Sequence, residues 1–262
     1  TYRVTGLQPP KGSIGYDFGS AALYTIENSD NHHVKLLASL LMLSLSIYND
    51  SDTAGKYTEA RDNFFLCMNN LTITDNKQQP AGGWAEGPEY HLYTMREYLP
   101  ALTALENQKL FSYASYPEIM ETHFTIPRMI MPDGYTPPFD DNGAVIFDMA
   151  PLLASRYRDR PERDALLWLW ERNGRPANKA FLADLIAQFD DTAPVHGNPG
   201  EMGWPLADFR PGTGYARFRS SWDRDALYFL FQTEQGEARI KGQAHEHPDP
   251  NAFILHGFGE ML

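Results

Sequence analysis

The spacing of apolar residues changes once along this chain, and that change limits its fold more than any other feature. From Asp30 to about Asp190, apolar residues recur every three or four positions, which is typical of amphipathic helices. After Asp191, short aromatic and aliphatic runs separated by Gly, Asp and Pro indicate strands. We therefore predict an α+β fold, in which a helical domain precedes an antiparallel β-sheet domain.

Seven helices are predicted in the first part. Their approximate ranges are 33–48, 53–70, 88–105, 116–131, 147–157, 162–173 and 178–189. Alternating long and short connections suggest helical hairpins packed around a centre, an α/α toroid or part of one. Two of these helices carry apolar stripes that we expect to be buried. These are Leu36, Leu37, Leu40, Leu41 and Ser44 on the first, and Tyr57, Ala60, Phe64, Cys67 and Met68 on the second.

The strands are predicted at 214–222, 226–232 and 251–256, after a loop-like linker at 193–203. We place the toroid domain at residues 1–192 and the start of the β-sheet domain at 193–262. The last residues indicate a strand, a glycine turn and the start of another strand, so we expect the domain to continue beyond Leu262. An N-terminal part of the toroid before Thr1 is left open.

Charge and cysteine content exclude several classes of protein. The chain has 22 Lys and Arg against 34 Asp and Glu, a net charge of −12, which argues against binding to nucleic acid or anionic membranes. The longest apolar run, from Leu36 to Leu45, is too short to cross a bilayer. A single cysteine, Cys67, excludes an internal disulfide and a metal site built from several cysteines.

Two polar clusters lie at predicted helix starts. Asn31, His32 and His33 combine an amide and imidazoles with free backbone N–H groups, a setting that suits an anion or an acid–base group. In the segment Gly82–Tyr93, Glu86 and Tyr90 begin a helix, and a tyrosine can serve as a general acid or base. The alternative for the first cluster is a solvated helix cap, and for the second it is aromatic packing.

Two further clusters lie in loops or strands. His245 and His247 point the same way if they lie in a strand, which suits a metal ligand beside a catalytic group. Asp133 and the pair Asp140-Asp141 could form a carboxylate pair with Glu86 for glycoside hydrolysis. The alternatives are a surface loop with chance histidines and ordinary solvated acidic loops.

Taken in order, these segments resemble a known family. The segments are Asn31-His32, Glu86-Gly-Pro-Glu-Tyr90-His-Leu-Tyr93, Arg217-Phe-Arg219-Ser-Ser-Trp222 and His245-Glu-His247-Pro-Asp249-Pro-Asn-Ala-Phe253. From about Asn28 onward the chain resembles the heparinase II/III-like polysaccharide lyases, which include oligoalginate and heparin or heparan lyases. The resemblance implies an α/α toroid followed by an antiparallel β domain, and β-elimination at a uronic acid.

The resemblance also implies roles for individual residues. Asn31 would help to neutralise the substrate carboxylate, and His245 would line the same cleft. His32 and Tyr90 would serve as base and acid, in an order set by the stereochemistry of the sugar. Tyr93 is the alternative to Tyr90. The predicted substrate-binding residues are Glu86, Tyr93, Arg96 and Arg219, although both arginines could instead form structural ion pairs.

The family often binds a structural zinc in its β domain. The resemblance makes His247 a candidate ligand, but the downstream Asp of that site would fall past Leu262. Lys35 stands three residues after His32, where some relatives have an acid, and this favours an alginate-like substrate over a heparin-like one. We expect an acidic polysaccharide or oligosaccharide as partner and a periplasmic or secreted location, and we leave a homodimer open.

Two other functions compete with a lyase. One is an inverting glycoside hydrolase on an α/α toroid that uses Glu86 with Asp140 or Asp141. The other is a carbohydrate-binding fragment that has no catalytic activity.

Overall fold

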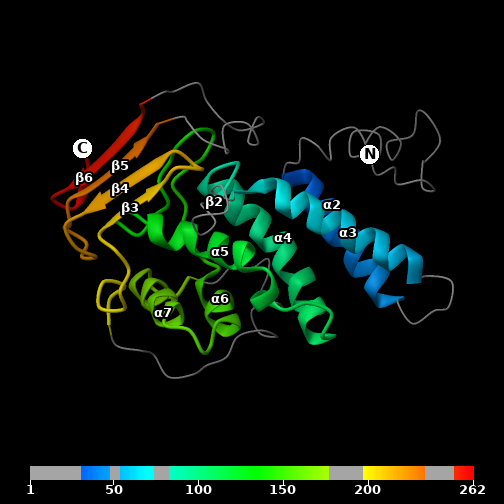
Figure 1. Cartoon of the computed structure of the whole chain (residues 1–262). Helices are drawn as coiled ribbons and strands as arrows, with labels where there is room; N and C mark the ends of the chain where they lie inside the picture. The colour runs from blue at the N-terminus through cyan, green and yellow to red at the C-terminus, as the bar shows by residue number, and fades with distance from the viewer. Residues whose placement is uncertain (1–30, 48–53, 74–82, 177–196, 234–250) are drawn as a thin grey trace.

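The computed structural model of this chain describes residues 31–47, 54–73, 83–176, 197–233 and 251–262. Figure 1 shows the helices gathered together and a sheet built from the C-terminal residues beside them. This arrangement confirms the predicted α+β class. The proposed domain boundary after residue 192 and the predicted helix at 178–189 lie outside the described residues.

The described helices lie close to their predicted positions. They are α2 (Asn31–Ser46), α3 (Ala54–Leu71), α4 (Pro88–Asn107), α5 (Pro117–Met129), α6 (Ala150–Arg156) and α7 (Glu162–Arg172), with a short 3-10 helix η2 at Tyr113–Ser115. Helix α5 ends before Met131, because a residue that precedes a proline, here Pro132, disfavours the helical conformation. Within the described part of the chain, no helix is both long and apolar enough to cross a bilayer.

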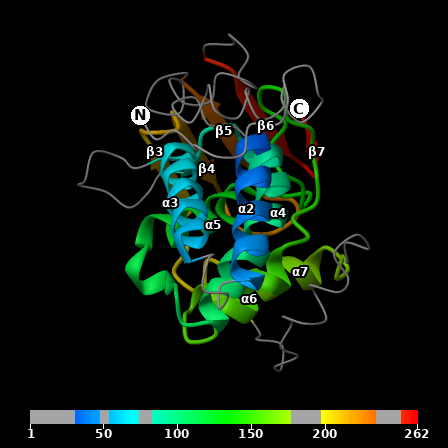
Figure 2. The same ribbon diagram turned by 90° about the vertical axis from the view of Figure 1, so that its right-hand side faces the viewer.

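Helix α2 packs along both α3 and α4 (Figure 2), and α6 packs on α7 as a second hairpin. The predicted stripe of α3 is buried throughout. On α2 the prediction was partly wrong, because Leu36, Leu37 and Leu40 are only half-buried. Val34 and Ala38 are buried with Leu41 instead. The buried face of α2 is therefore rotated from the predicted one, because the helix packs against both α3 and α4.

A column of rings runs through the helical core. Trp84 stacks on His91 with ring centroids 4.9 Å apart, and Tyr98 stacks on His123 at 5.6 Å. The His91 imidazole lies 3.2 Å from the Tyr98 hydroxyl. Burial lowers the pKa of His91 well below its usual value, and burial lowers the pKa of His123 to about 3. Both imidazoles are therefore neutral in the folded protein.

The C-terminal residues form a five-stranded antiparallel sheet in which neighbours in sequence are neighbours in space. Its strands are β3 (Ala207–Arg210), β4 (Tyr215–Arg219), β5 (Tyr228–Gln232), β6 (Phe253–Gly257) and β7 (Glu260–Met261). A small second sheet pairs β1 (Thr72–Ile73) with β2 (Gly83–Trp84). The sequence predicted β4 to β7 but not β3, which is only four residues long, nor the pair β1 and β2.

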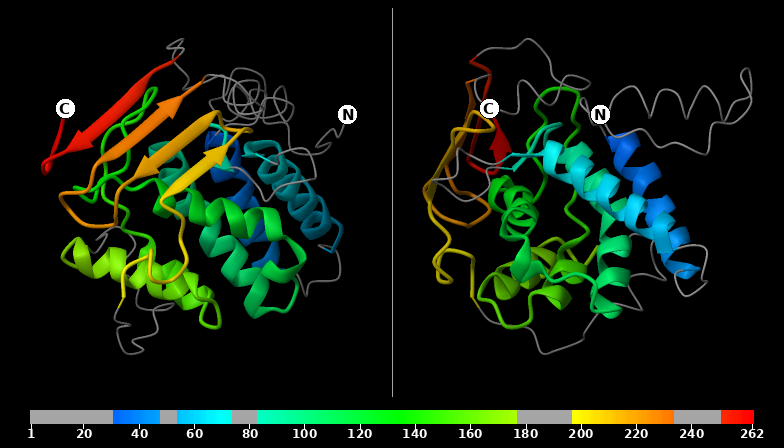
Figure 3. Two further views of the ribbon diagram at one scale, coloured as in Figure 1. Left: turned by 60° about the vertical axis from the view of Figure 1, so that its left-hand side comes forward. Right: turned by 45° about the vertical axis from the view of Figure 1, so that its right-hand side comes forward.

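The two faces of the large sheet differ. Tyr215, Tyr228 and Leu230 on the inner face are buried, whereas Phe218 and Phe253 on the outer face are 51% and 62% exposed. Figure 3 (left) shows the sheet lying over α5. The inner face thus forms a second, smaller apolar core with residues just after α5.

Three inner-face side chains join the sheet to the end of α5. Arg217 donates to the backbone carbonyl of Arg128, Tyr228 donates to that of Met129 at 2.8 Å, and Arg219 donates to that of Ile130 at 2.5 Å. The last carbonyls of a helix lack partners within it and carry partial negative charge. The sheet therefore supplies the donors that the C-terminal end of α5 needs.

Arg219 was predicted to bind substrate, which requires an exposed side chain. In the structure this arginine is buried in the junction between the sheet and α5. It is 7% exposed, and its guanidinium lies 3.7 Å from the centroid of the Trp222 ring. Burial lowers the pKa of Arg219 to about 9, and the positive charge of the neighbouring Arg217 acts in the same direction. Its contacts in the structure are those of a group that holds the sheet on the helices.

We expect Arg219→Met to lower the free energy of unfolding by about 3 kcal/mol, because it removes a charge-assisted hydrogen bond and leaves a buried carbonyl unpaired. Urea denaturation followed by circular dichroism measures the change. Arg175→Met is the control, because Arg175 is exposed, pairs with Glu171 one turn away and lies over the Trp170 ring, so its loss should cost about 1 kcal/mol or less. Equal losses in the two variants would contradict the structural role of Arg219.

Candidate active site at the starts of two helices

The first residues of α2 and α4 meet at one buried carboxylate, that of Glu86. Its Oε1 accepts hydrogen bonds from the backbone N–H and the side-chain amide of Asn31, both at 3.1 Å. Its Oε2 accepts a third, from the indole of Trp84 at 3.2 Å. Glu86 is 2% exposed and Asn31 is 1% exposed. The carboxylate therefore lies at the positive end of α2 and fixes the orientation of the Asn31 amide.

A distant loop builds the start of α4. Gly87 has a φ of +81°, which favours glycine, and Pro88 follows it at the first helical position. The Asn142 side chain accepts hydrogen bonds from the backbone N–H groups of Glu89 at 2.7 Å and Tyr90 at 3.2 Å. A Cβ on Gly87 would lie 2.5 Å from the Asn142 amide nitrogen, so this glycine also makes room for the loop.

The same loop contacts the predicted catalytic tyrosine. The hydroxyl of Tyr90, which is half-buried, donates to the Asp141 carboxylate at 3.3 Å. Burial raises the pKa of Tyr90, and the negative charge of Asp141 raises it further. Glu89 and Glu86 act in the same direction from the start of the helix. Tyr90 is thus held in its protonated form, which is the form that can donate a proton.

His32 and Tyr93 lie next to this group. His32 is exposed on the first turn of α2, directly after Asn31. Tyr93 is one turn beyond Tyr90, and its hydroxyl accepts a hydrogen bond from the Lys35 ammonium at 3.1 Å. That hydrogen bond is the main cause that raises the pKa of Lys35.

The other predicted residues that the structure describes lie elsewhere. Arg96, on α4, forms an ion pair of 2.8 Å with Asp148. The sequence analysis gave such a structural ion pair as the alternative to substrate binding for this arginine. Asp140 accepts hydrogen bonds from Gln232 at the end of β5, and Asp133 lies 3.9 Å from the buried His256 at the sheet junction. The predicted residues His245 and His247 lie outside the described residues.

The sequence did not identify Asn142 and Trp84, although both hold the site together. The run Asp140-Asp141-Asn142 before Gly143 is typical of a turn, and nothing in it indicates a contact with a helix more than fifty residues earlier. Trp84 lies in the glycine-rich segment that the sequence singled out, but its hydrogen bond to Glu86 depends on the fold.

The structure provides no metal site in its described part. Across 31–47, 54–73, 83–176, 197–233 and 251–262, no three His, Cys, Asp or Glu side chains cluster closely enough to hold a metal ion. His247 lies outside these ranges, so its role as a zinc ligand remains a prediction.

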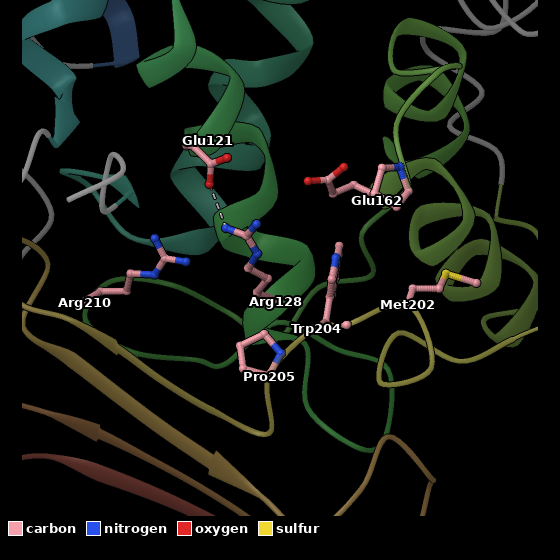
Figure 4. Close-up of a pocket in the computed structure, with 9 residues that line it drawn as sticks. Glu121, Arg128, Glu162, Met202, Trp204, Pro205 and Arg210 are labelled. Carbon is pink, nitrogen blue, oxygen red and sulfur yellow. Dashed lines mark hydrogen bonds and ion pairs between the residues drawn. The ribbon is translucent and has the colours of Figure 1, made fainter.

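A cavity of about 370 Å³ lies away from these residues, between α5, the start of α7 and the 202–205 turn (Figure 4). Its charged lining groups are engaged in ion pairs. Arg128 pairs with Glu121, Glu162 with Arg160, and Arg210 with Asp208, each at 3.0 Å. None of the predicted site residues lines this cavity, so the candidate site is the group around Glu86 and Tyr90.

We expect Glu86→Gln to lower the melting temperature by about 4–8 °C, a loss of about 2 kcal/mol, because one carbonyl oxygen cannot accept from all three N–H donors. Differential scanning calorimetry measures the change. Glu97→Gln is the control, since Glu97 makes only a long ion pair of 3.9 Å with Lys35. A melting temperature that Glu86→Gln leaves unchanged would show that the carboxylate does not hold the two helix starts.

Comparisons with known proteins identify solved structures that share this fold. No family model and no curated protein matches the chain. Among solved structures, heparinase III aligns with a TM-score of 0.63 at 12% identity, over 96% of this chain and 39% of its own. The heparan sulfate lyase HepC from Pedobacter heparinus aligns with a TM-score of 0.54 at 18% identity, over 95% of this chain and 37% of its own.

A heparinase III gene product aligns with a TM-score of 0.58 at 16% identity, over 95% of this chain and 35% of its own. The chain thus spans little more than a third of the length of these enzymes. Helical hairpins followed by an antiparallel sheet are shared over almost the whole of this chain. The predicted fold is confirmed: this chain has the fold of the corresponding part of the heparinase III structures.

Proposed function

We propose that this chain carries the helical side of a polysaccharide lyase site, which cleaves an acidic polysaccharide next to a uronic acid by β-elimination. The observation that carries the proposal is Tyr90, a half-buried tyrosine whose hydroxyl donates to the Asp141 carboxylate, beside the Asn31–Glu86 pair. The solved structures with this fold support it, since they include a heparan sulfate lyase and heparinase III.

The reaction needs three kinds of group. The proton on C5 of a uronic acid becomes acidic when the neighbouring carboxylate is neutralised. A base then removes this proton, its bonding electrons form the C4–C5 double bond, and the bond from C4 to the glycosidic oxygen breaks. An acid protonates the departing oxygen, and no water is consumed. A positioned acid or base contributes roughly 10²–10⁴ in rate, and stabilising the enolate charge contributes a comparable or larger factor.

The described residues fit these roles as follows. Tyr90 donates its proton to the departing oxygen, because burial, and after it the negative charge of Asp141, raises its pKa and keeps its hydroxyl protonated. His32, exposed at the adjacent helix start, removes the C5 proton. Asn31, buried at the positive end of α2 in an orientation held by Glu86, helps to neutralise the substrate carboxylate. In this proposal Glu86 acts through Asn31 as a positioning residue.

Other predicted roles remain proposals of the same kind. His245 completes the site from the β domain, and Tyr93 replaces Tyr90 if the tyrosine was misassigned. An alginate-like substrate, zinc bound with the help of His247, a homodimer and a periplasmic or secreted location remain predictions. In each case the proposed substrate is an acidic polysaccharide that contains uronic acid.

The hydrolase alternative has less support. Its first proposed carboxylate, Glu86, accepts three hydrogen bonds. Of its two proposed partners, Asp140 accepts hydrogen bonds from the Gln232 amide and Asp141 accepts one from the Tyr90 hydroxyl. A carboxyl group that protonates a glycosidic oxygen must turn its proton toward the substrate, whereas each of these carboxylates accepts hydrogen bonds from neighbouring protein groups.

The first test is turnover of an oligosaccharide panel of alginate, heparan sulfate and chondroitin. We expect an unsaturated uronyl product that absorbs in the ultraviolet, with the mass expected for cleavage without water. Tyr90→Phe should lower turnover by about 10²–10⁴ because it removes one catalytic proton donor.

Tyr135→Phe is the matched control, because Tyr135 is an exposed tyrosine outside the site. Its turnover should equal that of the unmodified chain. New reducing ends without ultraviolet absorbance would instead indicate a hydrolase, and full turnover by Tyr90→Phe would remove this residue from the chemistry.

The pH dependence of Asp141→Asn tests the role of Tyr90 as an acid. The negative charge of Asp141 raises the pKa of Tyr90, so its removal lowers that pKa. An acid is lost as the pH rises through its pKa, and we therefore expect the alkaline limb of kcat/KM to move to lower pH. The measurement is a pH profile of kcat/KM.

Asp133→Asn is the control, since Asp133 accepts a hydrogen bond from the Tyr135 backbone and lies away from Tyr90. Its alkaline limb should stay in place. Movement of the acidic limb in Asp141→Asn would make Tyr90 the base instead.

A further inference from the structure

The candidate site has an unfavourable charge for an acidic substrate. The chain as a whole carries a net charge of −12. Around Tyr90, the carboxylates of Glu86, Glu89 and Asp141 all raise its pKa, so the local field is negative as well. A polyanionic sugar chain would be repelled from such a surface unless a cation lies within its reach.

The two helices that form the site contain one Lys and one Arg between them, Lys35 on α2 and Arg96 on α4. Arg96 is 24% exposed in its side chain and is engaged by Asp148 at 2.8 Å. Lys35 is 49% exposed, and its ion-pair distance to Glu97 is 3.9 Å. Lys35 is thus the more accessible of these two basic side chains to an anion in solvent.

Two contacts with α4 hold the ammonium of Lys35 in place. Its Nζ lies 3.1 Å from the Tyr93 hydroxyl and 5.6 Å from the centroid of the Tyr93 ring. An ammonium has three donors, so the hydrogen bond to Tyr93 orients the group without using it up. Lys35 stands three residues after His32, a rise of about 4.5 Å along the same side of the helix.

We propose that Lys35 binds the acidic group, a carboxylate or a sulfate, of the sugar residue next to the uronic acid that is cleaved. This inference rests on the proposed function, because it takes His32 and Tyr90 as the place of bond cleavage. Lys35 lies about one helical turn beyond His32, so it can reach a sugar that neighbours the cleaved one. Lys35 then makes the site selective for substrates with charged neighbouring sugars, and Tyr93 positions its ammonium.

The test compares Lys35→Met with Lys35→Arg. Lys35→Met keeps the length of the side chain and removes its charge. We expect its KM for heparan sulfate or polymannuronate tetrasaccharides to rise about tenfold with kcat little changed, since one charge-assisted contact to the bound substrate is lost. Lys35→Arg should keep KM within about threefold, because the charge is retained.

Lys56→Met is the matched control, because Lys56 is 54% exposed and pairs with Glu59 near the start of α3, away from the candidate site. Its KM should stay at the unmodified value. The dependence of KM on ionic strength should be weaker in Lys35→Met than in the control.

Binding separates this inference from the proposed chemistry. Isothermal titration calorimetry of the same tetrasaccharides in the Tyr90→Phe background should give a dissociation constant about tenfold higher when Lys35→Met is added. If the unmodified chain yields no unsaturated product, the lyase proposal fails, and the binding comparison still tests Lys35. Unchanged affinity in Lys35→Met, or a fall in kcat at constant KM, would overturn the role of Lys35.

Discussion

The attachment of the sheet to the end of α5 is the constraint on which the rest of the structure depends. Two buried arginines and a tyrosine of the sheet donate to three successive backbone carbonyls at the C-terminal end of that helix. A buried guanidinium is costly unless its donors are used, and the end of a helix is costly unless its carbonyls are. Each element offsets part of the cost of the other, and these hydrogen bonds fix the position of the sheet on the helix.

That position determines the geometry of the candidate site. At the end of β5, Gln232 donates to Asp140 at 3.0 Å. The next two residues of the same loop reach α4, where Asp141 accepts from Tyr90 and Asn142 accepts from the first backbone N–H groups. The sheet, the loop and the helix therefore form one connected set of hydrogen bonds. The electrostatic environment of Tyr90 depends on a loop that the sheet holds in place.

The parts of this structure that could be predicted are those set by nearby residues. Gly87 and Pro88 marked the start of α4, and the spacing from Tyr57 to Met68 marked the buried face of α3. The burial of α2 was predicted less well, because it depends on which neighbours pack against the helix. Arg219 could not be assigned from its own segment, since a strand residue faces a substrate or a helix end according to the fold alone.

The pairing of Asn31 with Glu86 shows the same limit within the site. The sequence placed both residues at helix starts but gave them separate roles, as substrate-contacting groups. Their hydrogen bonds join positions 55 residues apart, and no local pattern encodes such a contact. The family resemblance in the order of the motifs thus predicted the kind of chemistry, whereas the hydrogen bonds between Asn31 and Glu86 could be found only from the coordinates.

The stacked rings of the helical core make the fold sensitive to acid. His123 has a folded pKa of about 3 against an ordinary value of 6.5, and that of His91 is also well below 6.5. Below pH 6.5 these imidazoles bind protons in the unfolded chain but stay neutral in the folded chain. Acidification therefore lowers the free energy of unfolding. For His123 this loss accumulates from pH 6.5 down to about 3. The Trp84–His91 stack, which borders Glu86, ties the candidate site to the same acid-labile core.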